Sequence, residues 1–232
     1  MRGTLVPQGM KTAAEAKWVK AQALSGAVFS AFLLVHLLNQ ALAVLGPARY
    51  DDAQRALRLG YQAPVLEVVL VLAPLLLHVG ASVGRLLSRR GAEVVVMTWR
   101  VRLHRWSGRF LLLVFAGHVV ATRGASFFYG VFPGFAGLAF TFRWVPAYFW
   151  PYYLLLALTG WCHLVHGLSV AGPLLGVRAL SVLQRPRVFR SVVGLGGLAL
   201  IVGVLSLGGV FFDVGDPAAS EYARLVQRLL SR

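Results

Sequence analysis

Four histidines lie singly in strongly apolar stretches of the sequence, where an imidazole is costly and therefore indicates a functional site. They are His36, His78, His118 and His163. Two of them end the same phrase, because nine residues separate Ser25-Gly26 from His36 and nine separate Ser107-Gly108 from His118. Imidazole is a common axial ligand of haem iron. The matched set predicts paired axial ligation of two haems.

The composition is that of a protein that crosses a membrane several times. Of the 232 residues, 58% are hydrophobic and only 13% are charged, and the mean hydropathy is +0.70. A bilayer span takes about 20 apolar residues. The windows that come closest to this requirement are 21–45, 64–87, 107–122 with the aromatic extension that follows it, 147–172 and 191–212. The third is the weakest, because Arg109 and Arg123 bracket a short core.

We therefore expect an all-α fold, an integral membrane bundle of five transmembrane helices. The bundle would occupy residues 21–212, between an N-terminal segment (1–20) and a C-terminal tail (213–232). No removable signal peptide is visible in the first twenty residues. Thr12 with Glu15 predicts the start of a helix that leads into the first span.

The formal net charge is +15, and arginines are concentrated in two loops between spans. They are Arg85, Arg89, Arg90, Arg100, Arg102, Arg105 and Arg109 in the first loop, and Arg178, Arg185, Arg187 and Arg190 in the second. By the positive-inside rule these loops face the cytoplasm, so the N-terminus is expected inside and the C-terminus outside. This distribution argues against nucleic acid as a partner. It suits anionic membrane lipid or a docked protein.

The depth of each histidine in its span predicts how the four pair. Spans one and three run outward, which puts His36 and His118 slightly outside the middle of the bilayer. Spans two and four run inward, which puts His78 and His163 on the inner side. The two levels are expected to lie on the order of 10 Å apart.

The serines of the repeated phrase lie about three turns below their histidines, at or below the inner haem. Ser25 and Ser107 could then hydrogen-bond a propionate or a ligand imidazole. Gly26 and Gly108 would let a macrocycle approach the backbone. A close helix–helix contact is the other reading of a Ser-Gly pair in a membrane helix.

The two remaining histidines, the cysteine and the carboxylates limit which cofactors and functions are possible. His166 is the rival of His163 as the fourth ligand, and His104 is expected at the membrane interface. The single cysteine, Cys162, excludes an intrachain disulfide and a cysteine-bound iron–sulfur cluster. Glu67 is the only carboxylate well inside a span, so a proton or metal transporter is harder to build.

The order of these motifs resembles the dihaem cytochrome b membrane anchor of succinate dehydrogenase and fumarate reductase, in its five-helix, single-chain form. The matching features are Ser25-Gly26 with His36, His78, Ser107-Gly108 with His118, and Trp150-Pro151 with His163 and Gly167-Leu168. The resemblance covers about residues 18–212. Its fourth-helix spacing favours His163 over His166.

The resemblance implies that His36 and His118 hold the haem distal to the soluble subunits, and that His78 and His163 hold the proximal one. It implies an anchor without catalytic residues of its own, which passes electrons between an iron–sulfur subunit and menaquinone or ubiquinone. A flavoprotein subunit and the iron–sulfur subunit would dock on the cytoplasmic face of a prokaryotic membrane. The whole complex could also form an oligomer.

Arg105 and Arg109 are the candidates for binding the haem propionates. The alternative is that they are ordinary arginines of a cytoplasmic loop and follow the positive-inside rule. Trp161 stands where some dihaem fumarate reductases have a glutamate used for proton movement, which disfavours that pathway here. Asp51, Asp52 and Glu67 are the unranked candidates for a quinone-site acid. The alternative functions are a b-type cytochrome of a hydrogenase or formate dehydrogenase, and a haem-free transporter or packing subunit.

Overall fold

The computed structural model describes residues 13–88 and 98–231, and within these ranges every regular element is a helix. Five helices are long and apolar enough to cross a membrane. The expectation of an all-α chain with five apolar spans is therefore confirmed, and the helices indicate a multi-pass membrane protein. The predicted cap at Thr12 and the loop arginines Arg89 and Arg90 lie outside the described residues.

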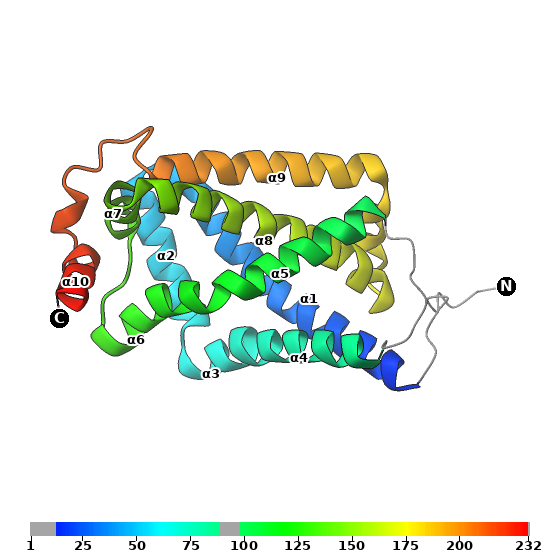
Figure 1. Ribbon diagram of the computed structural model, residues 1–232. Coiled ribbons are helices and arrows are strands. Elements are labelled where there is room, and N and C mark those ends of the chain that lie inside the picture. The colour runs from blue at the N-terminus through cyan, green and yellow to red at the C-terminus, as the bar shows by residue number, and fades with distance from the viewer. Residues whose placement is uncertain (1–12, 89–97, 232) are drawn as a thin grey trace.

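The five spans are built from seven α-helices and two π-helical turns. They are α1 (Ala13–Ala41); α3 (Pro64–Glu67), η2 (Val68–Leu72) and α4 (Ala73–Ser88); α5 (Trp99–Val119), η3 (Val120–Gly124) and α6 (Ala125–Tyr129); α8 (Pro146–Leu174); and α9 (Pro186–Leu207). Consecutive spans run in opposite directions, so α1 begins at one end of the bundle and the C-terminal α10 lies at the other (Figure 1).

The first span is the centre of the packing. α1 packs against α4, α8 and α9, and α5 packs against α8. Gly203 of α9 faces the backbone of α1 at Gln40 and Ala41, where a Cβ atom would collide. Small residues at such crossings let membrane helices approach closely. α9 thus closes the bundle over Leu37, Leu200 and neighbouring core side chains.

The third span runs from Trp99 to Tyr129, so it includes the expected window 107–122 with its aromatic extension and begins eight residues before Ser107. Arg123, which brackets the core of this span, forms a two-pronged pair through its guanidinium with Glu67 of the second span. Nη2 of Arg123 donates to Oε2 of Glu67 at 2.7 Å. A charge that is paired and hydrogen-bonded can be partly buried at far lower cost than an isolated one.

The shorter elements cover the ends of the bundle. They are η1 (Leu42–Leu45), α2 (Pro47–Tyr61), α7 (Phe135–Trp144), η4 (Arg178–Gln184), η5 (Pro217–Ala219) and α10 (Glu221–Leu230). The segment expected as a C-terminal tail therefore contains a helix. Ser220 caps α10 by accepting the N–H of Ala223 at 3.2 Å. Tyr222 and Leu225 then pack with Ala125 of α6.

Candidate functional site

The fold brings the four histidines into two facing pairs. The ring centres of His36 on α1 and His118 on α5 are 6.1 Å apart, with the ring planes at 77°. The ring centres of His78 on α4 and His163 on α8 are 6.2 Å apart, with the planes at 85°. The pairing is the one expected from depth along the spans.

This separation fits two imidazoles that share one metal. A ring nitrogen binds a metal at about 2.0 Å and the ring centre lies about 1 Å behind that nitrogen, so imidazoles on opposite sides of one iron have centres about 6 Å apart. Both pairs have this spacing. No group of three or more His, Cys, Asp or Glu side chains within residues 13–88 and 98–231 is arranged to hold a metal ion. A site of the zinc type, with three or four protein ligands, is therefore not what these residues form.

His78 and His163, called the inner pair after the expected orientation of the chain, are oriented by backbone carbonyls at equivalent places in the repeat. Nδ1 of His78 lies 3.1 Å from the backbone oxygen of Gln22, and Nδ1 of His163 lies 3.2 Å from that of His104. Gln22 and His104 each precede the serine of the repeated phrase by three residues. A carbonyl oxygen can only accept a hydrogen bond, so Nδ1 of each ring carries the hydrogen. Nε2 of each ring is then unprotonated and can coordinate a metal.

The glycines of the repeat make room for these same imidazoles. A Cβ atom on Gly26 would lie 2.7 Å from Nδ1 of His78, and one on Gly108 would lie 2.9 Å from Cε1 of His163. The expectation was that a macrocycle approaches the backbone here. The structure instead fills the clearance at each glycine with the imidazole of the following span.

The two serines of the repeat differ in their contacts. Ser107 Oγ donates to the backbone oxygen of His104 at 2.9 Å and lies 3.2 Å from Nδ1 of His163. Ser107 therefore contacts a candidate ligand, as one expectation had it. Ser25 is buried, but its hydroxyl donates to the backbone oxygen of Ala21 within its own helix at 2.7 Å.

His36 and His118, called the outer pair in the same sense, contact aromatic side chains. The hydroxyl of Tyr152 lies 3.4 Å from Nδ1 of His118, and the ring of Phe32 stacks on His36 at 5.7 Å. Tyr152 was missed by the sequence reasoning, although it precedes His163 by eleven residues. The same spacing separates Ser25 from His36, and it returns a residue to the same helix face.

Two further histidines lie beside the inner pair. The ring of His104 stacks on His163 with centres 4.0 Å apart and lies 4.8 Å from His166. His166 is buried and faces Phe189 of α9. The structure therefore places His163, rather than His166, opposite His78.

The propionate candidates lie on another face of α5. Arg105 and Arg109 are each two residues from the buried Ser107, which is about 200° around a helix. Both line a surface hollow together with Arg102 and Trp106. The structure does not bring them to the histidines, because helical periodicity turns them to the opposite side.

Arg85 is a cation that lies near His78, because both side chains contact Gln22. It lies two helical turns after His78, and its Nη1 donates to Oε1 of Gln22 at 3.0 Å. Gln22 is the residue whose carbonyl oxygen holds His78.

The carboxylates considered for a quinone site are engaged elsewhere. Glu67 pairs with Arg123, and the exposed Asp52 pairs with Arg55 at 3.0 Å. Asp51 accepts the N–H of Phe135 at 2.8 Å at the start of α7. Burial raises the pKa of the Asp51 carboxyl, while that hydrogen bond acts in the opposite direction.

Trp161 faces the fifth span. Its indole Nε1 donates to the backbone oxygen of Val192 at 3.1 Å, and its ring lies against Gly196. The side chain thus contributes to the packing of α8 on α9 and carries no transferable carboxyl proton.

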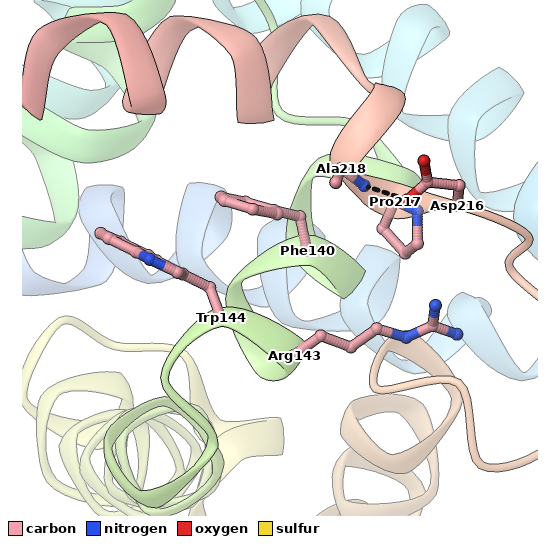
Figure 2. A pocket seen from close by; sticks show the side chains of 6 residues that line it. All are labelled: Phe140, Arg143, Trp144, Asp216, Pro217 and Ala218. Atoms are coloured by element: carbon pink, nitrogen blue, oxygen red, sulfur yellow. Dashed lines mark hydrogen bonds between the residues drawn. The ribbon is translucent and has the colours of Figure 1, made fainter. Parts of the chain in front are cut away.

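A hollow of about 220 Å³ lies between α7 and η5, apart from the histidines (Figure 2). Its lining comprises Phe140, Arg143, Trp144, Asp216, Pro217 and Ala218. Asp216 accepts the N–H of Ala218 at 3.0 Å, and Arg143 donates to the backbone oxygen of Gly215 at 2.9 Å. Both charged groups therefore hold the loop that follows α9.

Within residues 13–88 and 98–231, fold and site together define an all-helical arrangement with five apolar spans and two facing histidine pairs. No family model, curated protein or solved structure matches the chain.

Proposed function

We propose that this chain is the membrane anchor and transmembrane electron carrier of a succinate:quinone oxidoreductase, and that it holds two b haems through paired histidines. The observation that carries the proposal is the matched separation of the two pairs, 6.1 and 6.2 Å between ring centres, from four different helices. Two independent pairs with the same metal-sharing geometry are not needed for helix packing.

The chain's own residues would bind and orient the groups. His36 and His118 would hold the outer haem, and His78 and His163 the inner one. The carbonyl oxygens that accept from the inner Nδ1 atoms fix those rings and raise their basicity. Haem b supplies one-electron transfer between the ferric and ferrous states when it is bound.

The two levels would form steps across the membrane. Gly26 adjoins His78, and His36 follows ten residues later on the same helix; Gly108 and His118 repeat this relation. At a rise of about 1.5 Å per residue the levels lie about 15 Å apart along the helices. This is about half of the roughly 30 Å hydrocarbon core.

The repeated Ser-Gly phrase supports this complex over the b-type cytochrome of a hydrogenase or formate dehydrogenase. The proposed partners are a flavoprotein subunit and an iron–sulfur subunit on the cytoplasmic face of a prokaryotic membrane, with menaquinone or ubiquinone as electron partner. Arg85 is the proposed partner of an inner haem carboxylate, because it extends beside the contacts that hold His78.

Spectroscopy of the purified, dithionite-reduced protein tests the haem part. We expect a b-type α-band, two haems per chain, and loss of one haem in His163→Ala. The matched control His166→Ala, one turn away on the same helix, should retain both. Absence of any α-band after expression with haem supplied would overturn the proposal.

The partner part has its own test. The tagged chain, purified from its native membrane, should carry the two soluble subunits and couple succinate oxidation to quinone reduction. Two haems in a complex that lacks succinate activity would refute the assignment to this enzyme while retaining the electron-carrier role.

A further inference from the structure

A cationic hollow lies on the outer side of α5. It has a volume of about 250 Å³, and its lining is Arg102, Arg105, Trp106 and Arg109. Their spacing of three, four and seven residues puts all four side chains on one face of the helix. Among residues 13–88 and 98–231, the side chains that line the hollow are three arginines and one tryptophan.

This face is directed away from the rest of the bundle. Ser107, in the middle of the segment, is buried against His163 of α8, and the arginines beside it emerge about 200° away. The indole of Trp106 is 65% exposed, and the guanidinium of Arg109 lies 5.1 Å from its ring centre.

The same face becomes apolar within one turn. Leu113 follows Arg109 by four residues and is 80% exposed, and Val120, seven residues further on, is 71% exposed. Leu112 beside them is 60% exposed. A row of cations and an indole therefore continues into a strip of uncovered apolar side chains along a membrane-spanning helix.

We propose that this surface binds an anionic phospholipid. The phosphate lies among Arg102, Arg105 and Arg109, the glycerol region against Trp106, and an acyl chain along Leu112, Leu113 and Val120. Guanidinium groups recognise phosphate through paired, charge-assisted hydrogen bonds. Tryptophan is enriched at the level of the headgroups.

The apolar strip is what favours a lipid over a soluble protein. An acidic protein surface would match the arginines alone, whereas a lipid matches both the cations and the uncovered side chains that continue into the hydrocarbon region. The proposal does not depend on the haem assignment, since it uses only the outward face of α5.

Lipid titration of the delipidated protein in neutral detergent, followed by native mass spectrometry, tests the site. We expect phosphatidylglycerol to bind about tenfold more tightly than phosphatidylcholine, because arginines near the headgroups attract anionic lipid. The triple variant R102Q/R105Q/R109Q should lose this preference. Its thermal unfolding midpoint should stay close to wild type, because substitutions of exposed side chains have small effects.

The matched control is R178Q/R187Q/R190Q, which removes three exposed cations from η4 and the start of α9. This region lies at the same end of the bundle, as the 3.1 Å bond from Arg100 to the backbone oxygen of Gln184 shows. It should keep the preference for phosphatidylglycerol.

Equal loss in both triple variants would overturn the site, because the effect would then be one of net charge. Unchanged lipid preference in R102Q/R105Q/R109Q, with loss of a co-purifying soluble partner, would assign the surface to protein docking instead. Glycerol 3-phosphate that competes as well as the intact lipid would refute the role of the apolar strip.

Discussion

Substitution of Gly26 by alanine is the sharpest test of how the inner histidines are positioned. The added Cβ would lie 2.7 Å from Nδ1 of His78, about 0.7 Å closer than the 3.4 Å at which ordinary contact begins. The ring of His78 must move to relieve this contact, and the movement would disturb the hydrogen bond between its Nδ1 and the carbonyl oxygen of Gln22.

The cost of such overpacking is about 1–3 kcal/mol. Iron ligation is more sensitive than stability, since a shift of about 0.7 Å is a third of a metal–nitrogen bond of about 2.0 Å. We therefore expect Gly26→Ala to lose the inner haem and keep the outer one. Haem content per chain and the low-spin EPR signals measure this directly.

Gly80→Ala is the matched control, because no atom lies within 4 Å of the added Cβ. It should keep both haems and gain up to about 1 kcal/mol of helix stability. Gly108→Ala, with its 2.9 Å approach to His163, should resemble Gly26→Ala. Two haems with unaltered EPR signals in Gly26→Ala would refute the clearance argument.

Three other perturbations have defined outcomes. Glu67→Gln should lower the free energy of unfolding by about 1–3 kcal/mol by leaving the partly buried Arg123 unpaired, and adding Arg123→Gln should recover part of it in thermal unfolding. Ser107→Ala should raise the midpoint potential of the inner haem, because Nδ1 of His163 loses a hydrogen-bond acceptor. Ser25→Ala removes a hydrogen bond within α1 only and should leave the potential unchanged in redox titration. The raised pKa of Asp51 means that its ionised form is disfavoured in the folded state, so its contribution to stability falls as pH rises above 3.8; Asp51→Asn should remove that share in unfolding measured across pH.

The long elements were predictable because their signal is local. Hydropathy alone located the five apolar spans, and the positions of His36, His78, His118 and His163 within them were enough to predict which rings face each other. The membrane orientation and the haems stay predictions from charge and resemblance.

The ion pair that Arg123 forms within the third span was not predictable from that span's own residues. A charge at Arg123 reads as a helix end unless its partner is known, and Glu67 lies 56 residues earlier in the chain. The stacking of His104 on His163 depends in the same way on the α5–α8 contact. Such long-range pairs have no periodic trace in a single sequence.

Some of the site was available in the sequence and was overlooked. The helical position of Arg105 and Arg109 relative to Ser107 already directs them away from the histidines. Eleven residues before His78 and His163 stand Glu67 and Tyr152, at the spacing that joins each serine to its histidine.

The exchange of contacts between neighbouring spans has a consequence for biogenesis. The hairpin of α1 and α4 supplies His36 and His78, and the hairpin of α5 and α8 supplies His118 and His163. Neither hairpin supplies both histidines of a pair, so each proposed haem would bind one histidine from each half of the protein. Insertion of the cofactors would then reinforce the packing of α1 on α8 and α9 that already joins the two halves, and chains starved of cofactor would hold them by that packing alone.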